Sequence, residues 1–200
     1  MLSYVPGFSI GGSPVNAHAA ALLTDPHPCG HIVYPYTDEG LVEQAVTLFA
    51  CGGLRNGEGV ILVTTADHWN QIRQRLLAEG YDVETLQQRG QLGFAPAEDL
   101  LARFLVQGVP NEDIFREVLS GMIANSRAST GKADGRVRIF GEMVSLLWNA
   151  DLGATISLEE MWNGVIEEHS VSLMCTYALG GRKDVPVELH ALHSHSLHPD

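Results

Sequence analysis

The chain has 200 residues, 45% hydrophobic and 18% charged, so it is long and apolar enough for a buried core and wholesale disorder is excluded. Its 24 acidic residues outnumber 12 basic ones, and the net charge of −12 repels nucleic acids and anionic membranes as partners. Three cysteines without a C-x-x-C pair, and no signal-peptide pattern or membrane-length apolar run, predict a cytoplasmic protein without a disulfide framework.

The first 28 residues contain several prolines and glycines and no sustained hydrophobic period. We therefore predict a flexible N-terminal arm over residues 1–28. After it, short apolar runs alternate with amphipathic stretches, which is typical of a sheet with crossover helices. No linker interrupts this alternation, so we predict a single α/β domain over residues 29–200.

The first half of this domain alternates strands with helices. In chain order we predict a strand over 31–34, a helix from Asp38 to Asn56, a strand over 59–64, a helix carrying Ile72 and Leu76, a short helix over 83–88 and a strand over 92–95. The run 59–64 is continuously apolar, as in strands that helices bury on both faces. We therefore place it in the interior of the sheet.

The second half continues the pattern with longer helices. We predict a helix opened by Pro110 and Asn111, a strand over 136–140, helices over 142–148 and 158–168, a strand over 171–177 and a final helical segment over 185–195.

A phosphate-binding loop is missing where a nucleotide-hydrolysing α/β domain would carry it. The connection 64–69, which follows the buried strand, has no glycine and no lysine, and Asp67 would repel a phosphate. The glycine-rich stretch 52–57 precedes the strand, and we interpret it as a helix stop. We therefore expect no nucleotide hydrolysis.

Motifs for covalent or metal chemistry are also weak. Cys175 lies in an apolar run, where a thiol is usually buried and inert, and no G-x-S-x-G is present. Five histidines gather toward the C-terminus, but without a matching Cys or carboxylate spacing we interpret them as a solvated stretch: His169, His190, His193, His195 and His198. We expect no catalytic residue, no metal and no cofactor.

The positive signal is a set of aromatic and polar residues near the ends of predicted strands, where ligands bind in open α/β sheets. The set is Tyr34, Tyr36, Thr64, Thr65, Glu142, Trp148 and Tyr177. Aromatic walls with a few hydrogen-bonding groups suit a small, mostly apolar molecule, although packing explains each aromatic residue equally well. Glu142 is costly if unpaired, so we expect it to meet a ligand, a basic side chain or backbone amides.

Five segments in order resemble the MEDS domain, the methanogen/methylotroph DcmR sensory domain, from about His31 to Pro199. They are HIVYPY at 31–36, GLRNGE at 53–58, RIFGEMV at 138–144 with Leu147 and Trp148, LEEMWN at 158–163 and SLMCTY at 172–177. The resemblance implies a RecA-like, P-loop-NTPase-like layered sheet with flanking helices whose phosphate loop is lost. In one departure, Val33 stands where the commoner pattern has a cysteine, so no role of that cysteine transfers to this chain.

The resemblance also implies sensing of simple hydrocarbon derivatives for bacterial transcription regulators and histidine kinases. We expect a non-catalytic domain that binds a small organic ligand and acts in trans on such a kinase or regulator, or belongs to a longer sensor; a homodimer stays open. Two alternatives are a degenerate nucleotide-binding domain without hydrolysis, and a hydrolase or transferase with Glu142 as base. The missing basic residue near 64–69 counts against the first, and the missing nucleophile against the second.

Overall fold

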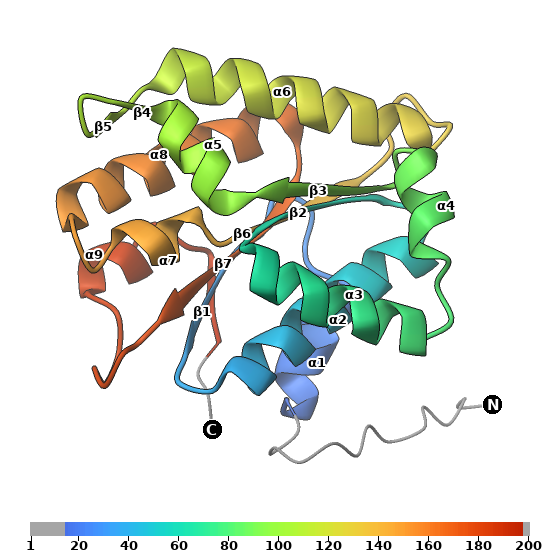
Figure 1. Ribbon diagram of the computed structural model, residues 1–200, viewed down its shortest axis with the longest axis horizontal. Coiled ribbons are helices and arrows are strands. Elements are labelled where there is room, and N and C mark those ends of the chain that lie inside the picture. The colour runs from blue at the N-terminus through green and yellow to red at the C-terminus, as the bar shows by residue number, and fades with distance from the viewer. Residues whose placement is uncertain (1–14, 198–200) are drawn as a thin grey trace.

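A computed structural model describes residues 15–197 and contains one six-stranded sheet in the order β3-β2-β6-β7-β1-β8 (Figure 1). All pairings in this sheet are parallel. The strands are β1 (His31–Tyr36), β2 (Gly59–Thr64), β3 (Leu92–Pro96), β6 (Val137–Gly141), β7 (Ser172–Ala178) and β8 (His195–Ser196). The predicted α/β layered fold is confirmed.

Helices cover both faces of the sheet, so the molecule has three layers (Figure 1). One face carries α1 (Ala17–Thr24), α2 (Glu39–Arg55), α3 (Ala66–Ala78) and α4 (Val83–Gln88). The other carries α5 (Ala97–Phe104), α6 (Glu112–Ser129), α7 (Met143–Leu147), α8 (Leu152–His169) and α9 (Val187–His190). A small antiparallel hairpin, β4 (Leu105–Val106) and β5 (Val109–Pro110), follows α5.

Strand β2 lies in the interior of the sheet between β3 and β6, as its apolar run predicted. Val60 and Leu62 point to the α2 face, whereas Ile61 and Val63 point to the α6 face. Each of these side chains is buried, because side chains alternate across a strand and helices cover both sides.

The boundaries of two predicted elements are wrong. Helix α8 starts at Leu152 instead of residue 158, because Asp151 caps it by accepting a 2.9 Å hydrogen bond from the amide of Ala154. The predicted helical segment over 185–195 contains only the short α9. Beyond α9 the chain becomes extended, and the amide of Ser194 donates to the carbonyl of His31, which starts the pairing of β8 with β1.

The predicted arm over residues 1–28 is corrected for its second half, while residues 1–14 lie outside the described part. Helix α1 buries Leu23 completely against the α2 side of the core. The fully buried Arg138 of β6 donates from Nη1 to the carbonyl oxygens of Leu23 and Thr24, at 3.2 and 2.9 Å. Long-range contacts therefore fix α1, although its own sequence carries little periodicity.

The glycine pair 52–53, interpreted above as part of a helix stop, lies inside α2. A Cβ atom on Gly52 would stand 2.2 Å from the carbonyl oxygen of Thr24, so no side chain fits there. Gly53 leaves room for Arg138, whose Nε donates to the carboxylate of Glu58. These glycines allow α1 and the buried Arg138–Glu58 ion pair to approach α2 closely.

Within residues 15–197, none of the helices combines the length and the apolar composition needed to cross a bilayer.

Candidate functional site

A pocket of about 700 Å³ lies at the carboxyl edge of the sheet, where β1, β2, β6 and β7 end. Ligands bind at this edge in open α/β sheets. Its lining is Tyr36, Glu39, Glu43, Thr65, Asp67, His68, Asn70, Gln71, Glu98, Glu142, Ser145, Leu146 and Ala178.

Glu142 is held at the wall of this pocket by the sheet itself. Its amide donates to the carbonyl of Val63 at 2.9 Å, which continues the pairing of β6 with β2 and brings its carboxylate beside the end of β2. There Oε2 accepts hydrogen bonds from the Thr64 hydroxyl at 2.6 Å and the Thr65 amide at 2.9 Å. Burial would raise the pKa of Glu142, but hydrogen bonds from His68 and Thr64 outweigh it and lower that pKa.

His68, in the first turn of α3, is the strongest partner of Glu142. Its Nδ1 lies 2.6 Å from Oε1 of Glu142, and its Nε2 lies 2.7 Å from Oε2 of Glu39. The hydrogen bond to Glu142 raises the pKa of His68 to about 9, although partial burial works in the opposite direction. His68 is therefore an imidazolium ion at neutral pH, bound between two carboxylates.

The basic partner and backbone amide that Glu142 was expected to meet are therefore His68 and the amide of Thr65. Sequence reasoning did not select His68. A signal existed, because a histidine in the first helical turn after a buried strand projects to the same edge as the strand ends.

The pocket is acidic and mostly polar. Five carboxylates line it, and Arg75 neutralises one of them by binding Glu43 at 2.8 Å. Aromatic surface comes from Tyr36, whose pKa is raised mainly by burial and further by Glu39 and Glu142. The expected aromatic walls are thus reduced to one side chain, and the lining favours a ligand that carries hydrogen-bond donors.

The structure brings together four of the seven predicted residues. Tyr36, Thr65 and Glu142 line the pocket, and Thr64 lies fully buried behind Glu142. Tyr34 packs in the core on the α2 side of the sheet and does not contribute to the lining.

Trp148 and Tyr177 lie outside the lining of this pocket. Tyr177 points to the α8 face of β7, where its hydroxyl donates to Glu159, while the next residue, Ala178, reaches the pocket. Trp148 packs edge-on against Tyr177, with ring centroids 5.7 Å apart. The guanidinium carbon of Arg182 lies 4.3 Å from the centroid of the Trp148 ring. The alternation of side chains along a strand explains why Tyr177 and its neighbour face opposite sides.

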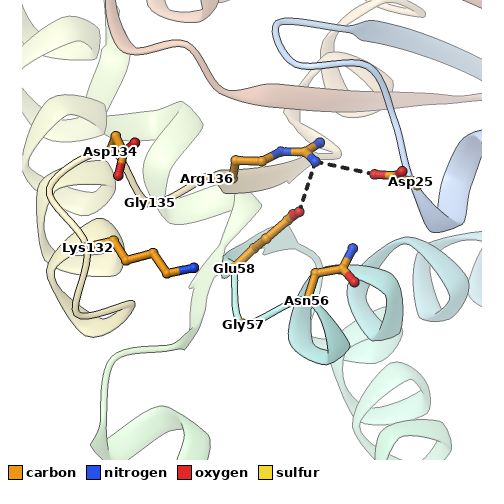
Figure 2. A pocket seen from close by; sticks show the side chains of 8 residues that line it. All are labelled: Asp25, Asn56, Gly57, Glu58, Lys132, Asp134, Gly135 and Arg136. Atoms are coloured by element: carbon orange, nitrogen blue, oxygen red, sulfur yellow. Dashed lines mark hydrogen bonds and ion pairs between the residues drawn. The ribbon is translucent and has the colours of Figure 1, made fainter.

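A second pocket, of about 370 Å³, lies at the amino edge of the sheet, before β2 and β6 (Figure 2). Arg136 bridges Asp25 and Glu58 there at 3.3 Å each, and Lys132 and Asp134 flank it. None of the seven predicted site residues lines this pocket, and the main charges in it are already paired.

The C-terminal histidines do not form one solvated stretch. His169 contacts the hydroxyl of Ser120 at 2.8 Å and His190 contacts Asp184 at 3.0 Å, both partly exposed, and His198 lies outside the described residues. The His193 side chain, in contrast, is completely buried beside Glu159. The interpretation as a solvated stretch is therefore wrong for His193.

Comparisons with known proteins agree with this architecture. The family described as MEDS, the methanogen/methylotroph, DcmR sensory domain, matches residues 30–196. A KaiC-like protein from the hyperthermophilic archaeon Pyrococcus horikoshii OT3 has a similar structure, with a TM-score of 0.54 and 16% identity over 86% of this chain and 73% of that protein. At this identity the likeness shows the RecA-like fold alone. Among curated proteins, no significant match was found.

Proposed function

This chain belongs to the MEDS sensory domain family, and from that premise we propose that it senses a small organic molecule bound at the carboxyl edge of its sheet. We place the ligand in the pocket beside Glu142. The volume of about 700 Å³ lies within the range of about 300–1,000 Å³ that is usual for small-molecule sites.

The observation that carries the proposal is the hydrogen bonding of Glu142. A carboxylate offers about four acceptor positions, and three are taken by Thr64, Thr65 and His68. One acceptor position on Oε1 is left at the pocket wall. A ligand hydroxyl or amino group donating to it would form a charge-assisted hydrogen bond.

The charge of the lining narrows the ligand class. Carboxylates such as Asp67 and Glu98 repel phosphates and carboxylic acids, and attract amines or polarised hydroxyl groups. Tyr36, Leu146 and Ala178 supply a modest apolar surface. We therefore propose a simple hydrocarbon derivative that carries a hydroxyl or amino group.

We also propose that binding occurs without chemistry. The described lining contains no cysteine or lysine, and the lowered pKa of Glu142 makes it a poor general base at neutral pH. The bound state would then be read by a histidine kinase or transcription regulator in the cytoplasm.

Native mass spectrometry of the purified protein tests for a co-purifying small molecule. Thermal shift measurements with short alcohols, amines and carboxylates then test the ligand class, because a ligand at about one hundred times its Kd adds roughly 2.7 kcal/mol to the unfolding free energy. We expect stabilisation by alcohols or amines. A panel in which carboxylates stabilise most would contradict the proposed ligand class.

The variant Glu142→Gln keeps the shape of the side chain and removes its charge. Binding should weaken by about 1.5–3 kcal/mol, while Glu167→Gln, on the exposed surface of α8, should leave it unchanged. Equal ligand responses in the wild type and Glu142→Gln would remove Glu142 from the site.

A further inference from the structure

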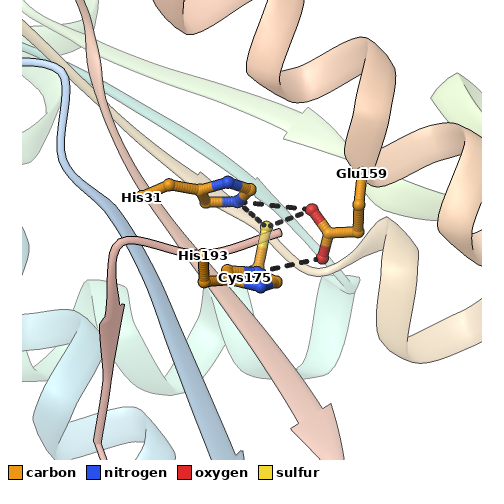
Figure 3. Close-up of side chains that lie close together, drawn as sticks. All are labelled: His31, Glu159, Cys175 and His193. Carbon is orange, nitrogen blue, oxygen red and sulfur yellow. Dashed lines mark hydrogen bonds and ion pairs between the residues drawn. The ribbon is translucent and has the colours of Figure 1, made fainter. Parts of the chain in front are cut away.

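Four side chains from four separate segments meet in the core beneath α8, away from the ligand pocket (Figure 3). They are His31 at the start of β1, Cys175 in β7, Glu159 in α8 and His193 between α9 and β8. The side chain of His31 is 3% exposed, and the side chains of Glu159, Cys175 and His193 are completely buried. We refer to these four residues as the histidine–cysteine cluster.

The potential ligand atoms of this cluster all lie within 4.8 Å of one another. Nε2 of His31 lies 3.3 Å from Oε2 of Glu159 and 3.5 Å from Sγ of Cys175. Sγ of Cys175 lies 3.5 Å from the same Oε2, and Nε2 of His193 lies 3.3 Å from Oε1. Tetrahedral zinc, with bonds of about 2.0–2.3 Å, separates its ligand atoms by about 3.3–3.8 Å.

Hydrogen bonds outside the cluster orient both imidazole rings. Nδ1 of His31 lies 2.9 Å from Oδ1 of Asn163. The side-chain nitrogen of Asn163 donates to the carbonyl of Leu192 at 3.0 Å, so it is the oxygen of Asn163 that faces the His31 ring. Nδ1 of His193 lies 2.7 Å from the carbonyl of Leu189. Both Nδ1 atoms therefore carry the proton, and both Nε2 atoms point inward. Metal-binding histidines are held by partners of this kind.

Without a metal ion, the charge of the cluster balances only when one of the two rings carries a second proton, and the other protonation states are unfavourable. Neutral rings would turn the Nε2 lone pairs of His31 and His193 toward the carboxylate of Glu159, and Nε2 of His193 has no hydrogen-bond partner. A second proton on each ring would instead bury two positive charges beside one carboxylate. A divalent cation bound to the thiolate of Cys175, the carboxylate and two neutral imidazoles brings the net charge to zero.

We propose that the histidine–cysteine cluster binds one zinc ion through Nε2 of His31, Nε2 of His193, Sγ of Cys175 and one carboxylate oxygen of Glu159. Two nitrogens, one sulfur and one oxygen form a ligand set that zinc accepts, and four protein ligands are typical of a structural site. Binding releases the thiol proton of Cys175 to solvent and involves no redox change. The hydroxyl of Tyr177 donates to Glu159 and orients the carboxylate.

The position of the cluster indicates what the ion does. His193 belongs to the segment that leads from α9 into β8, whereas the other three ligands belong to β1, β7 and α8. Zinc therefore links the segment between α9 and β8 to the central part of the sheet, and the free energy of zinc binding adds to the free energy of folding.

The metal content of the purified full chain, measured by mass spectrometry, tests the proposal directly. We expect about one zinc ion per chain, and a lower thermal midpoint after removal of the metal with dipicolinate. Replacement by cobalt should produce the visible bands of tetrahedral Co²⁺ and a near-ultraviolet thiolate-to-cobalt band. Cys175→Ser should lose the near-ultraviolet band, and His193→Ala should lower the metal content.

Two control variants separate the cluster from other groups of the same kind. Cys51→Ser removes another buried cysteine, and His190→Ala removes a histidine from α9; both should retain the metal and the spectrum. If Cys175→Ser fails to fold, the thiolate band of Cys51→Ser still decides whether another cysteine binds cobalt. A chain that holds no zinc after purification or reconstitution, or a Cys175→Ser spectrum equal to that of the wild type, would overturn the proposal.

Discussion

Glu142 accepts a 2.6 Å hydrogen bond from Nδ1 of His68, and the pair joins the end of β6 to the first turn of α3. The same carboxylate accepts from the amide of Thr65, the N-cap residue of α3. Helix N-termini attract anions, and here a side chain of the protein occupies this position. The arrangement fixes the end of β6 to α3 and lowers the pKa of the carboxyl group at the pocket wall, which is therefore ionised at neutral pH.

The His68–Glu142 pair makes stability depend on pH. The pKa of His68 is about 9 in the folded protein and about 6.5 in the unfolded chain, so its contribution is complete below about pH 6.5 and lost as pH rises through 9. Because His68 is partly exposed and tightly paired, we expect a loss of about 1–3 kcal/mol over this range. Urea denaturation at pH 6 to 9.5 measures it.

His68→Asn is the matched control, because an amide can still donate to Glu142 but does not titrate. This variant should remove most of the slope between pH 6.5 and 9. Parallel curves for wild type and variant would show that other groups cause the pH dependence.

Helix α1 should contribute measurably to stability. Leu23→Ala removes a fully buried side chain from the core between α1 and α2, so we expect a loss of about 2–4 kcal/mol in the unfolding free energy. His18→Ala, on the exposed side of the same helix, should change it by less than about 0.5 kcal/mol. Denaturant titration compares the two. A small effect of Leu23→Ala would mean that the N-terminal segment does behave as a loose arm.

The buried ion pair Arg138–Glu58 gives a second stability test. Arg138→Met leaves Glu58 with Arg136 at 3.3 Å as its remaining cation, so we expect a loss of about 3–5 kcal/mol. The double variant Arg138→Met/Glu58→Gln should lose less stability than the sum of the two single variants, because it no longer contains a buried carboxylate whose one remaining cation is the partly exposed Arg136. Strict additivity in this double-mutant cycle would contradict a direct coupling of the two side chains.

The sequence predicted those parts of the fold that local patterns specify. Strand β2 and helix α4 have the predicted limits; a continuous apolar run specifies β2, and in the structure the side chain of Asp82 caps α4. Helix α1 escaped prediction because its contacts are long-range: Leu23 packs in the core beside α2, and Arg138, more than a hundred positions away in the chain, donates to the end of the helix. Close packing at Gly52 is likewise invisible in a local pattern.

In the candidate sites too, features that follow from local sequence patterns could be predicted, and features that depend on long-range contacts could not. Of the residues selected by the rule that ligands bind at strand ends, Tyr36, Thr65 and Glu142 line the pocket, because the rule depends only on where strands end. Tyr177 does not line this pocket, since the face to which a strand residue points depends on its register in the folded sheet. The histidine–cysteine cluster could not be found from spacing, because its members come from both ends of the chain.

Nucleotide binding is the last property that the structure allows us to predict. A triphosphate at the first turn of α3 would need backbone amides and a lysine, but the amide of Thr65 is already bonded to Glu142, and Asp67 and Glu98 add negative charge. We expect calorimetry to detect no heat of binding with magnesium and ATP or GTP up to about millimolar concentrations, and no hydrolysis. Glu142→Gln removes one negative charge from the pocket but adds no cation, so this variant should remain equally inactive toward nucleotides. Micromolar affinity in either protein would instead support a degenerate nucleotide-binding domain, and the ligand class proposed for this pocket would have to be replaced.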